Sequence, residues 1–215
     1  MSLLKQYRND SAKELYSEFL EAYNQYPIPE TIKRRTTPIN LNKEFACDIL
    51  FVKDPMASEF VVLGKDSKYY NILKYLQSKN LKLESSIWID CIPYCPEVKV
   101  GEDIKVRPPN TSEQAIAKQY LNALIDNMKP KMIVLFGNIS LKMFKDGPSI
   151  LEEHGKKFNL LGNDFFPLYS LNYLATFDGE NKNAVQAELL KDIDALIDDI
   201  KEHHPEFIKG KKSNE

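Results

Sequence analysis

Two kinds of hydrophobic pattern alternate along this chain. Predominantly apolar runs, which are typical of buried strands, occupy four short segments: 45–52, 87–92, 132–136 and 165–169. Apolar residues at three- and four-residue spacing, which are typical of amphipathic helices, recur in the segments between and around them: 11–24, 69–77, 111–128, 138 to about 144, 150–153 and 183–201. This alternation predicts the α/β class, as a three-layer α/β/α sandwich around a central, mostly parallel, four-stranded sheet.

Capping and breaking residues mark where several of these segments begin and end. Ser11 with Glu14, and Thr111 with Gln114, have the spacing of capping boxes at helix starts. The proline-containing segment 93–110 is expected to be a long loop, and loops of this length often carry function.

The chain is expected to form one domain. A length of 215 residues favours a single domain, assigned here to 1–208 and followed by a disordered basic tail at 209–215. Asp54, Asp90, Asn138 and Ser170 each follow a predicted strand. Because the carboxyl ends of parallel strands meet at one edge, these residues should converge there.

Composition excludes several classes of protein. The 29 basic and 31 acidic residues give a net charge of -2, which excludes a uniformly basic surface but allows a local basic groove. No apolar run approaches the roughly 18 residues of a membrane helix, and the first residues lack a signal-peptide pattern. We therefore expect a cytoplasmic protein, a monomer, with no membrane partner. Cys47, Cys91 and Cys95 are too few for a disulfide framework.

Several ordered motifs resemble the uracil-DNA glycosylase superfamily over residues 45–175. They are Asp54-Pro55 after the first strand, Asp90 after the second, the run 107–113 (Arg-Pro-Pro-Asn-Thr-Ser-Glu), Lys129-Pro130, the segment 133–138 (Ile-Val-Leu-Phe-Gly-Asn) and the segment 166–174 (Phe-Pro-Leu-Tyr-Ser-Leu-Asn-Tyr-Leu). The nearest branch carries an iron–sulfur cluster on four cysteines, so three cysteines cannot hold it intact. A zinc site on these cysteines and a histidine is the alternative to buried structural thiols, which we favour. No cofactor and no metal are expected.

The resemblance implies catalytic roles for three residues. Asp54 matches the aspartate that positions water and stabilises the sugar cation, although Asp-Pro is also an ordinary turn. Ser170 stands where the family has a histidine that donates to O2 of the departing base, and Asn172 is a second candidate donor. His154 is interpreted as an ordinary surface histidine.

The same resemblance implies how the base is recognised. Asp90 replaces an asparagine that reads uracil, and an ionised carboxylate accepts from cytosine N4 but repels uracil O4. Met56 replaces a tyrosine that excludes substituents on C5, and Phe60 is the candidate for stacking on a flipped base. The alternatives are a capping role for Asp90 and core packing for Met56. Together these residues predict a 5-modified cytosine.

The candidate DNA contacts are mostly basic. Asn138 opens a helix that could bind phosphate. The other candidates, each of which could equally be a solvated charge, are Lys53, Lys65, Arg107, Lys156 and Lys157.

These inferences predict a monofunctional DNA glycosylase that uses no Schiff-base lysine. Its substrate would be a 5-modified cytosine, such as glucosylated hydroxymethylcytosine, flipped from duplex or single-stranded DNA and removed to leave an abasic site. Defence against bacteriophage DNA is the role that such a substrate suggests. The alternatives are a repair glycosylase for uracil or another deaminated base, and a catalytically silent DNA-binding module on the same fold.

Overall fold

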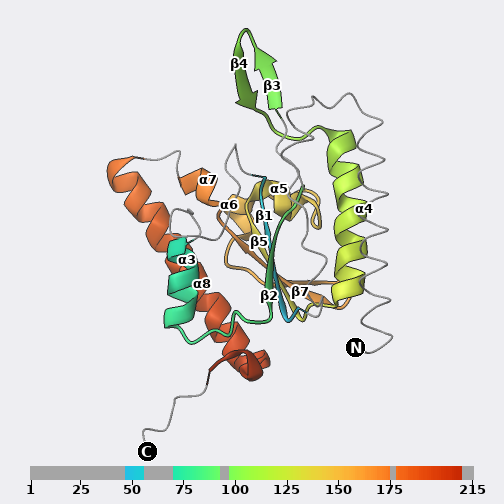
Figure 1. Cartoon of the computed structure of the whole chain (residues 1–215). Coiled ribbons are helices and arrows are strands. Elements are labelled where there is room, and N and C mark those ends of the chain that lie inside the picture. The colour runs from blue at the N-terminus through green and yellow to red at the C-terminus, as the bar shows by residue number, and fades with distance from the viewer. Residues whose placement is uncertain (1–46, 56–69, 93–96, 175–177, 210–215) are drawn as a thin grey trace, which may run out of the picture.

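A computed structural model describes residues 47–55, 70–92, 97–174 and 178–209 (Figure 1). The predicted helix at 11–24 lies outside these residues, as does nearly all of the predicted tail. Four of the residues singled out from the sequence also lie outside them: Met56, Phe60, Lys65 and Cys95.

The central sheet confirms the predicted α/β fold and has one strand more than predicted. Its order is β2-β1-β5-β7-β6. The strands are β1 (Ile49–Lys53), β2 (Ser86–Asp90), β5 (Met132–Phe136), β6 (Phe158–Leu160) and β7 (Asn163–Leu168). The four predicted strands run parallel, and β6 pairs antiparallel with β7. A three-residue edge strand has no buried apolar run, so the sequence pattern does not reveal β6.

Helices cover both faces of the sheet and complete the three layers. Helices α3 (Tyr70–Ser78) and α8 (Gly179–His203) lie on one side, and α4 (Thr111–Met128) lies on the other (Figure 1). The Tyr75 hydroxyl of α3 donates to Asp194 of α8 at 2.9 Å. No helix among the described residues is long and apolar enough to cross a membrane.

Helix α4 begins with a capping box that is shifted from the predicted one. The N-cap is Asn110, whose side chain accepts from the Glu113 N–H at 2.9 Å, while the Glu113 carboxylate accepts from the Asn110 N–H. Thr111 and Gln114 have the same spacing but lie one residue too late, because two overlapping pairs fit this pattern.

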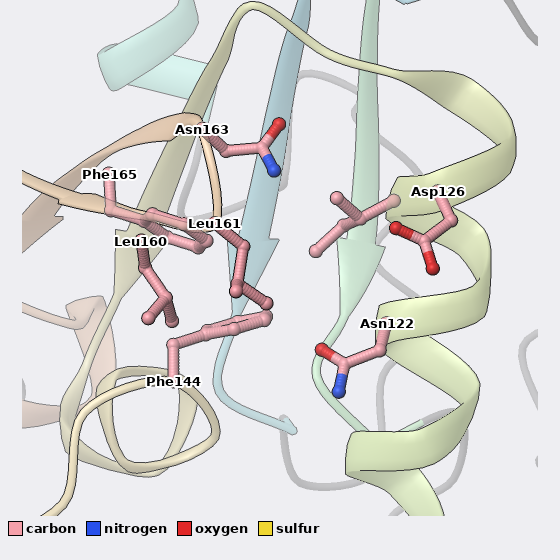
Figure 2. A pocket seen from close by; sticks show the side chains of 8 residues that line it. Asn122, Asp126, Phe144, Leu160, Leu161, Asn163 and Phe165 are labelled. Atoms are coloured by element: carbon pink, nitrogen blue, oxygen red, sulfur yellow. The ribbon is translucent and has the colours of Figure 1, made fainter.

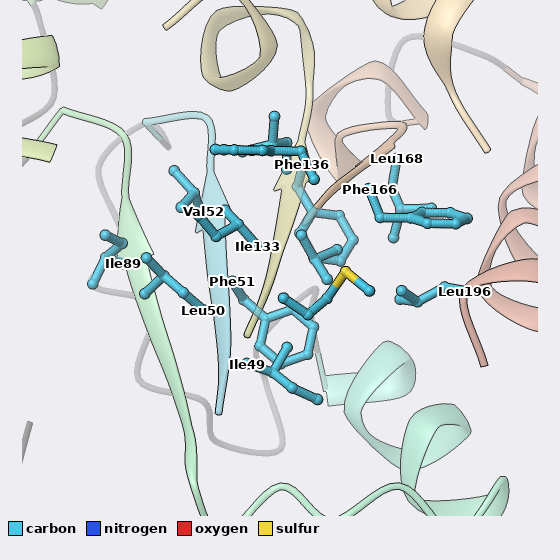
Figure 3. Packing of buried hydrophobic residues seen from close by; sticks show 14 of the residues in the cluster. Ile49, Leu50, Phe51, Val52, Ile89, Ile133, Phe136, Phe166, Leu168 and Leu196 are labelled. Atoms are coloured by element: carbon cyan, nitrogen blue, oxygen red, sulfur yellow. The ribbon is translucent and has the colours of Figure 1, made fainter. Parts of the chain in front are cut away.

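Large apolar side chains of the parallel strands form the core. All five residues of β5 and all of β1 are buried, and Phe166 and Leu168 of β7 lie toward Leu196 of α8 (Figure 3). Burying one such side chain stabilises the fold by about 1.5–3 kcal/mol.

Short helices follow the strands at the carboxyl edge of the sheet. Helices α5 (Asn138–Lys142) and α6 (Ile150–Glu153) come after β5, and α7 (Leu171–Leu174) comes after β7. At the far end of the chain, the 3-10 helix η1 (Pro205–Phe207) follows α8.

The segment 93–110 is not a loop throughout, so this expectation was wrong for residues 97–106. Strands β3 (Glu97–Val100) and β4 (Asp103–Val106) pair as an antiparallel hairpin that projects from the body (Figure 1). Gly101, at a φ of +66°, begins the turn, a backbone conformation that favours glycine. Alternating apolar residues were a signal for these strands, but each strand has only four residues.

Candidate active site

The predicted site residues on the four parallel strands lie at one edge of the sheet. Asp54 follows β1 and Asp90 ends β2, whereas Asn138 and Ser170 each come two residues after β5 and β7. Backbone hydrogen bonds join these strand ends to one another. The Asp54 N–H donates to the Phe136 carbonyl at 2.9 Å, and the Gly137 N–H donates to the Leu168 carbonyl at 2.9 Å.

The carboxylate of Asp54 lies against the first turn of α5. Its Oδ1 accepts from the Ser140 N–H at 2.7 Å, and its side chain is only 8% exposed. Burial raises the pKa of Asp54 from 3.8 to about 6, although hydrogen bonds from Ser140, Ile139 and Asn138 oppose this rise. A buried carboxylate that is ionised at neutral pH can stabilise a nearby positive charge or accept a proton.

Two residues of this arrangement escaped the catalytic interpretation of the sequence. Gly137 has a φ of +107°, and a β-carbon there would lie 2.1 Å from Asp54 Oδ2. Ser140 supplies the N–H that binds Asp54 from 86 positions away in the chain. A glycine between an apolar strand and a helix start was the available signal, because glycine permits such close backbone approach.

Asn138 has partners other than a ligand. Its side-chain Oδ1 accepts from the Ile150 N–H of α6 at 3.0 Å. The first turn of α5, expected to bind phosphate, instead binds the Asp54 carboxylate. The start of α5 therefore stabilises a negative charge that belongs to the protein itself. The helix dipole would favour a phosphate group at this place for the same electrostatic reason.

Lys53 and Asp90 form an ion pair where β1 and β2 end. The two residues are register partners in the parallel sheet, and the Lys53 ammonium donates to Asp90 Oδ1. Their side chains are 4% and 14% exposed, respectively. Lys53 was a candidate for lining the DNA groove or for a solvated charge. Its burial excludes the solvated charge and places it beside the candidate residue for base recognition, while its contact with DNA stays a prediction.

Stacked aromatic rings lie before and beside this ion pair on the same face of the sheet. Phe51 and Trp88 are register partners two positions before Lys53 and Asp90, and Phe136 is the partner of Lys53 on β5. The ring centroids of Phe51 and Trp88 lie 4.1 Å apart, and those of Trp88 and Phe136 lie 5.5 Å apart. The charges therefore lie next to apolar surroundings, in which electrostatic interactions are stronger than in water.

The described cysteines do not fit a shared metal or an iron–sulfur cluster. Cys47 precedes β1 and Cys91 follows β2, so the parallel register places them at opposite edges of the sheet. Burial raises the pKa of Cys47 to about 12 and that of Cys91 well above its usual range, which favours protonated thiols. Within the described residues, no three histidine, cysteine or acidic side chains are grouped to hold a metal.

Ser170 has a structural partner, and its role as a donor to the base stays a prediction. Its hydroxyl oxygen accepts from the Tyr173 N–H at 3.1 Å at the start of α7, and the residue is 5% exposed. Asn172, the second candidate donor, is the second residue of α7. A serine with this partner is a poor substitute for a histidine, because it carries no positive charge.

His154 is not the ordinary surface residue that the sequence suggested. Its Nδ1 lies 2.7 Å from Asp192 Oδ2 of α8, and its ring stacks on Tyr169 with centroids 4.1 Å apart. Gly155 approaches the same carboxylate so closely that a β-carbon would lie 2.4 Å from Asp192 Oδ1. His154 therefore connects the end of α6 to α8.

The other described basic candidates all have partners within the protein. Arg107 donates two hydrogen bonds of 2.7 Å to the carboxylate of Glu113. Lys156 donates to the Glu152 carbonyl at 2.6 Å, and Lys157 lies 2.6 Å from Asp199. Contacts between these residues and DNA stay a prediction.

A partly apolar cavity of about 180 Å³ lies apart from the predicted site residues, between α4 and the turn that joins β6 to β7 (Figure 2). Of the catalytic and base-recognition candidates that the structure describes, none lines it. Its lining residues are Asn122, Ile125, Asp126, Phe144, Leu160, Leu161, Asn163 and Phe165.

Comparison of the sequence with models of known protein families finds a match over much of the chain. The sequence model described as the Uracil DNA glycosylase superfamily matches residues 63–194, which is more than half of the chain. No curated protein matches the sequence. The matched range includes Asp90, Asn138 and Ser170, whereas Lys53 and Asp54 precede it.

Proposed function

The chain belongs to the uracil-DNA glycosylase superfamily, and we propose that it removes a 5-modified cytosine from DNA. The membership indicates a DNA glycosylase, a hydrolase of the N-glycosidic bond with DNA as its substrate. The flipped base would be a cytosine with a C5 group such as glucosylated hydroxymethyl, and the product would be an abasic site.

The ion pair between Lys53 and Asp90 is the observation that carries this proposal. In this pair Asp90 is a carboxylate, which accepts hydrogen bonds and donates none. Cytosine presents an amino donor at N4, whereas uracil presents the acceptor O4 at the same place. A wrong base would leave buried polar groups unpaired, and such a mismatch can reduce kcat/KM by a factor of about 10⁴.

Asp54 supports the hydrolytic step. The C1′–N1 bond breaks, its electron pair leaves with the base, and positive charge develops on the sugar. A water oxygen then bonds to C1′, and the proton that it loses passes to Asp54. Since the pKa of Asp54 is about 6, the carboxylate is largely ionised at neutral pH and suits both tasks.

The C5 modification is argued from sequence alone. Met56 stands where relatives have a tyrosine that blocks C5, and it lies outside the described residues. Cytosines with large C5 groups occur throughout the genomes of certain bacteriophages. An enzyme that excises them would therefore act in defence against those viruses.

An abasic-site assay on matched duplexes tests the proposal. The duplexes differ at one position, which carries glucosylated hydroxymethylcytosine, plain cytosine or uracil. We expect abasic product from the modified cytosine alone, and none from the Asp54→Asn variant. Cleavage of uracil alone would show a repair enzyme, and the absence of product from every duplex would favour a silent DNA-binding module.

A further inference from the structure

Lys53 and Asp90 together form a two-point match to one edge of cytosine. The carboxylate accepts hydrogen bonds and the ammonium beside it donates them. Cytosine carries an amino donor at N4 next to an acceptor at N3, and O2 is a further acceptor on the same edge. Uracil reverses both groups, with an acceptor at O4 and a donor at N3.

From this juxtaposition we propose that Lys53 is a catalytic residue. Its ammonium donates a hydrogen bond to N3 or O2 of the base that Asp90 holds, and it stabilises the negative charge that this base acquires as it leaves. The inference rests on the proposed function, because it requires that a base binds beside Asp90.

A cation at this position suits the charge that develops in the reaction. When the C1′–N1 bond breaks, both bonding electrons stay on the base, and the charge spreads from N1 to O2 and N3. The ammonium then holds that charge through its hydrogen bond, and water completes the reaction at C1′ while Asp54 takes the water's proton. No oxidant, reductant or covalent intermediate with the lysine is required.

The other candidates for this task are engaged elsewhere. Ser170, at the family position of the histidine, is neutral and accepts from the Tyr173 N–H. His154 is bonded to Asp192 and stacked on Tyr169. Lys53 is the last residue of β1 and directly precedes Asp54, so the chain itself brings the cation and the candidate catalytic carboxylate to the same edge of the sheet.

The surroundings of Lys53 suit this role. The side chain is 4% exposed. It lies two positions beyond the stacked rings of Phe51 and Trp88, and its register partner on β5 is Phe136, whose ring stacks on Trp88. A fixed charge that is shielded from water stabilises a developing charge far better than a solvated lysine does. The cost of burying the ammonium is offset by its pairing with Asp90.

A leaving-group series distinguishes this catalytic role from a structural one. Single-turnover excision is measured on duplexes that carry cytosines with different C5 substituents, chosen to vary the acidity of N1. We expect Lys53→Met to lose at least about 100-fold in rate, as for removal of one donor to a developing anion. The loss should be largest for the least acidic base, so the plot of log rate against leaving-group pKa becomes steeper.

Two further variants serve as controls, one for destabilisation of the fold and one for the removal of any lysine. Lys53→Met leaves Asp90 buried without its partner, so a second variant, Lys53→Gln, removes the positive charge but keeps an amide donor for the Asp90 carboxylate. Lys201→Met removes an exposed lysine of α8 that pairs with the exposed Asp198, and it should leave the slope unchanged. An equal loss on every base, or no loss, in a variant with wild-type thermal unfolding would overturn the role of Lys53.

The bases that the wild-type enzyme excises distinguish a failure of this inference from a failure of the proposed function. If it excises only uracil derivatives, the proposed substrate fails, and the slope across 5-substituted uracils still decides whether Lys53 stabilises the leaving base. If it excises modified cytosine but the slope is unchanged in the lysine variants, the substrate holds and the inference fails. If it excises no base, both fail.

Discussion

The Asp54 carboxylate lies so close to Gly137 that a β-carbon on residue 137 would be 2.1 Å from Asp54 Oδ2. The approach lets the first N–H groups of α5 reach the carboxylate, including that of Ser140 at 2.7 Å. Gly137 also has a φ of +107°, which other residues rarely adopt. A single glycine therefore determines how the candidate catalytic carboxylate is held.

Gly137→Ala is predicted to destabilise the fold and to abolish excision. The added methyl group displaces Asp54 and imposes an unfavourable φ, so we expect a loss of at least about 2 kcal/mol in the free energy of unfolding. Urea unfolding measures this loss, and the abasic-site assay measures the rate. Gly162→Ala is the matched control, because Gly162 has a φ of +83° with no atom within 4 Å of an added β-carbon. Equal effects of the two substitutions would show that the contact with Asp54 is unimportant.

Asp54→Asn is predicted to stabilise the protein at high pH while it removes activity. The folded-state pKa of Asp54 is raised from 3.8 to about 6, so the stability linked to its protonation is complete below pH 4 and is lost as pH rises through 6. At pH 8 the variant should therefore gain up to about 3 kcal/mol, and at pH 4 almost nothing. The free energy of unfolding, measured at pH 4 and at pH 8, checks this prediction, and the exposed Asp198→Asn is the control.

The rate of excision should depend on pH through the same group. If Asp54 acts as a carboxylate, the single-turnover rate rises about tenfold per pH unit at low pH and levels off above about 6. A plateau that begins near pH 4 would contradict the burial-raised pKa. A rate that falls across this range would mean that the protonated acid is the active form.

His154→Phe is predicted to loosen the connection between α6 and α8. Phenylalanine can keep the stacking on Tyr169 but cannot bond to Asp192, whose own pKa is raised by burial. Leaving that carboxylate without its partner should cost about 1–3 kcal/mol in the free energy of unfolding. His203→Phe serves as the comparison, since His203 is exposed on the same helix as Asp192. If His154→Phe lowers the free energy of unfolding by no more than His203→Phe does, the bond between His154 and Asp192 has no structural role.

The local hydrophobic pattern was sufficient to predict the longer strands and helices, but it was insufficient to predict the shortest strands. The apolar run at 132–136 is the strand β5 to the residue, because a strand buried on both faces has no polar position inside it. The hairpin at 97–106 and the strand β6 were missed because each of these strands has only three or four residues. These strands are stabilised by pairing with a neighbouring strand, and the sequence of one segment alone does not reveal that pairing.

The sequence by itself determined the succession along the chain of the four parallel strands and the longer helices, since periodicity depends on neighbouring residues. It therefore also determined that Asp54, Asp90, Asn138 and Ser170 meet at one edge of a parallel sheet. Only the tertiary structure decided their partners. Lys53 binds Asp90 across 37 positions, and Asp54 binds the Ser140 N–H across 86. Such pairs depend on strand register and on the approach of a helix start, and these arise only when the whole sheet assembles.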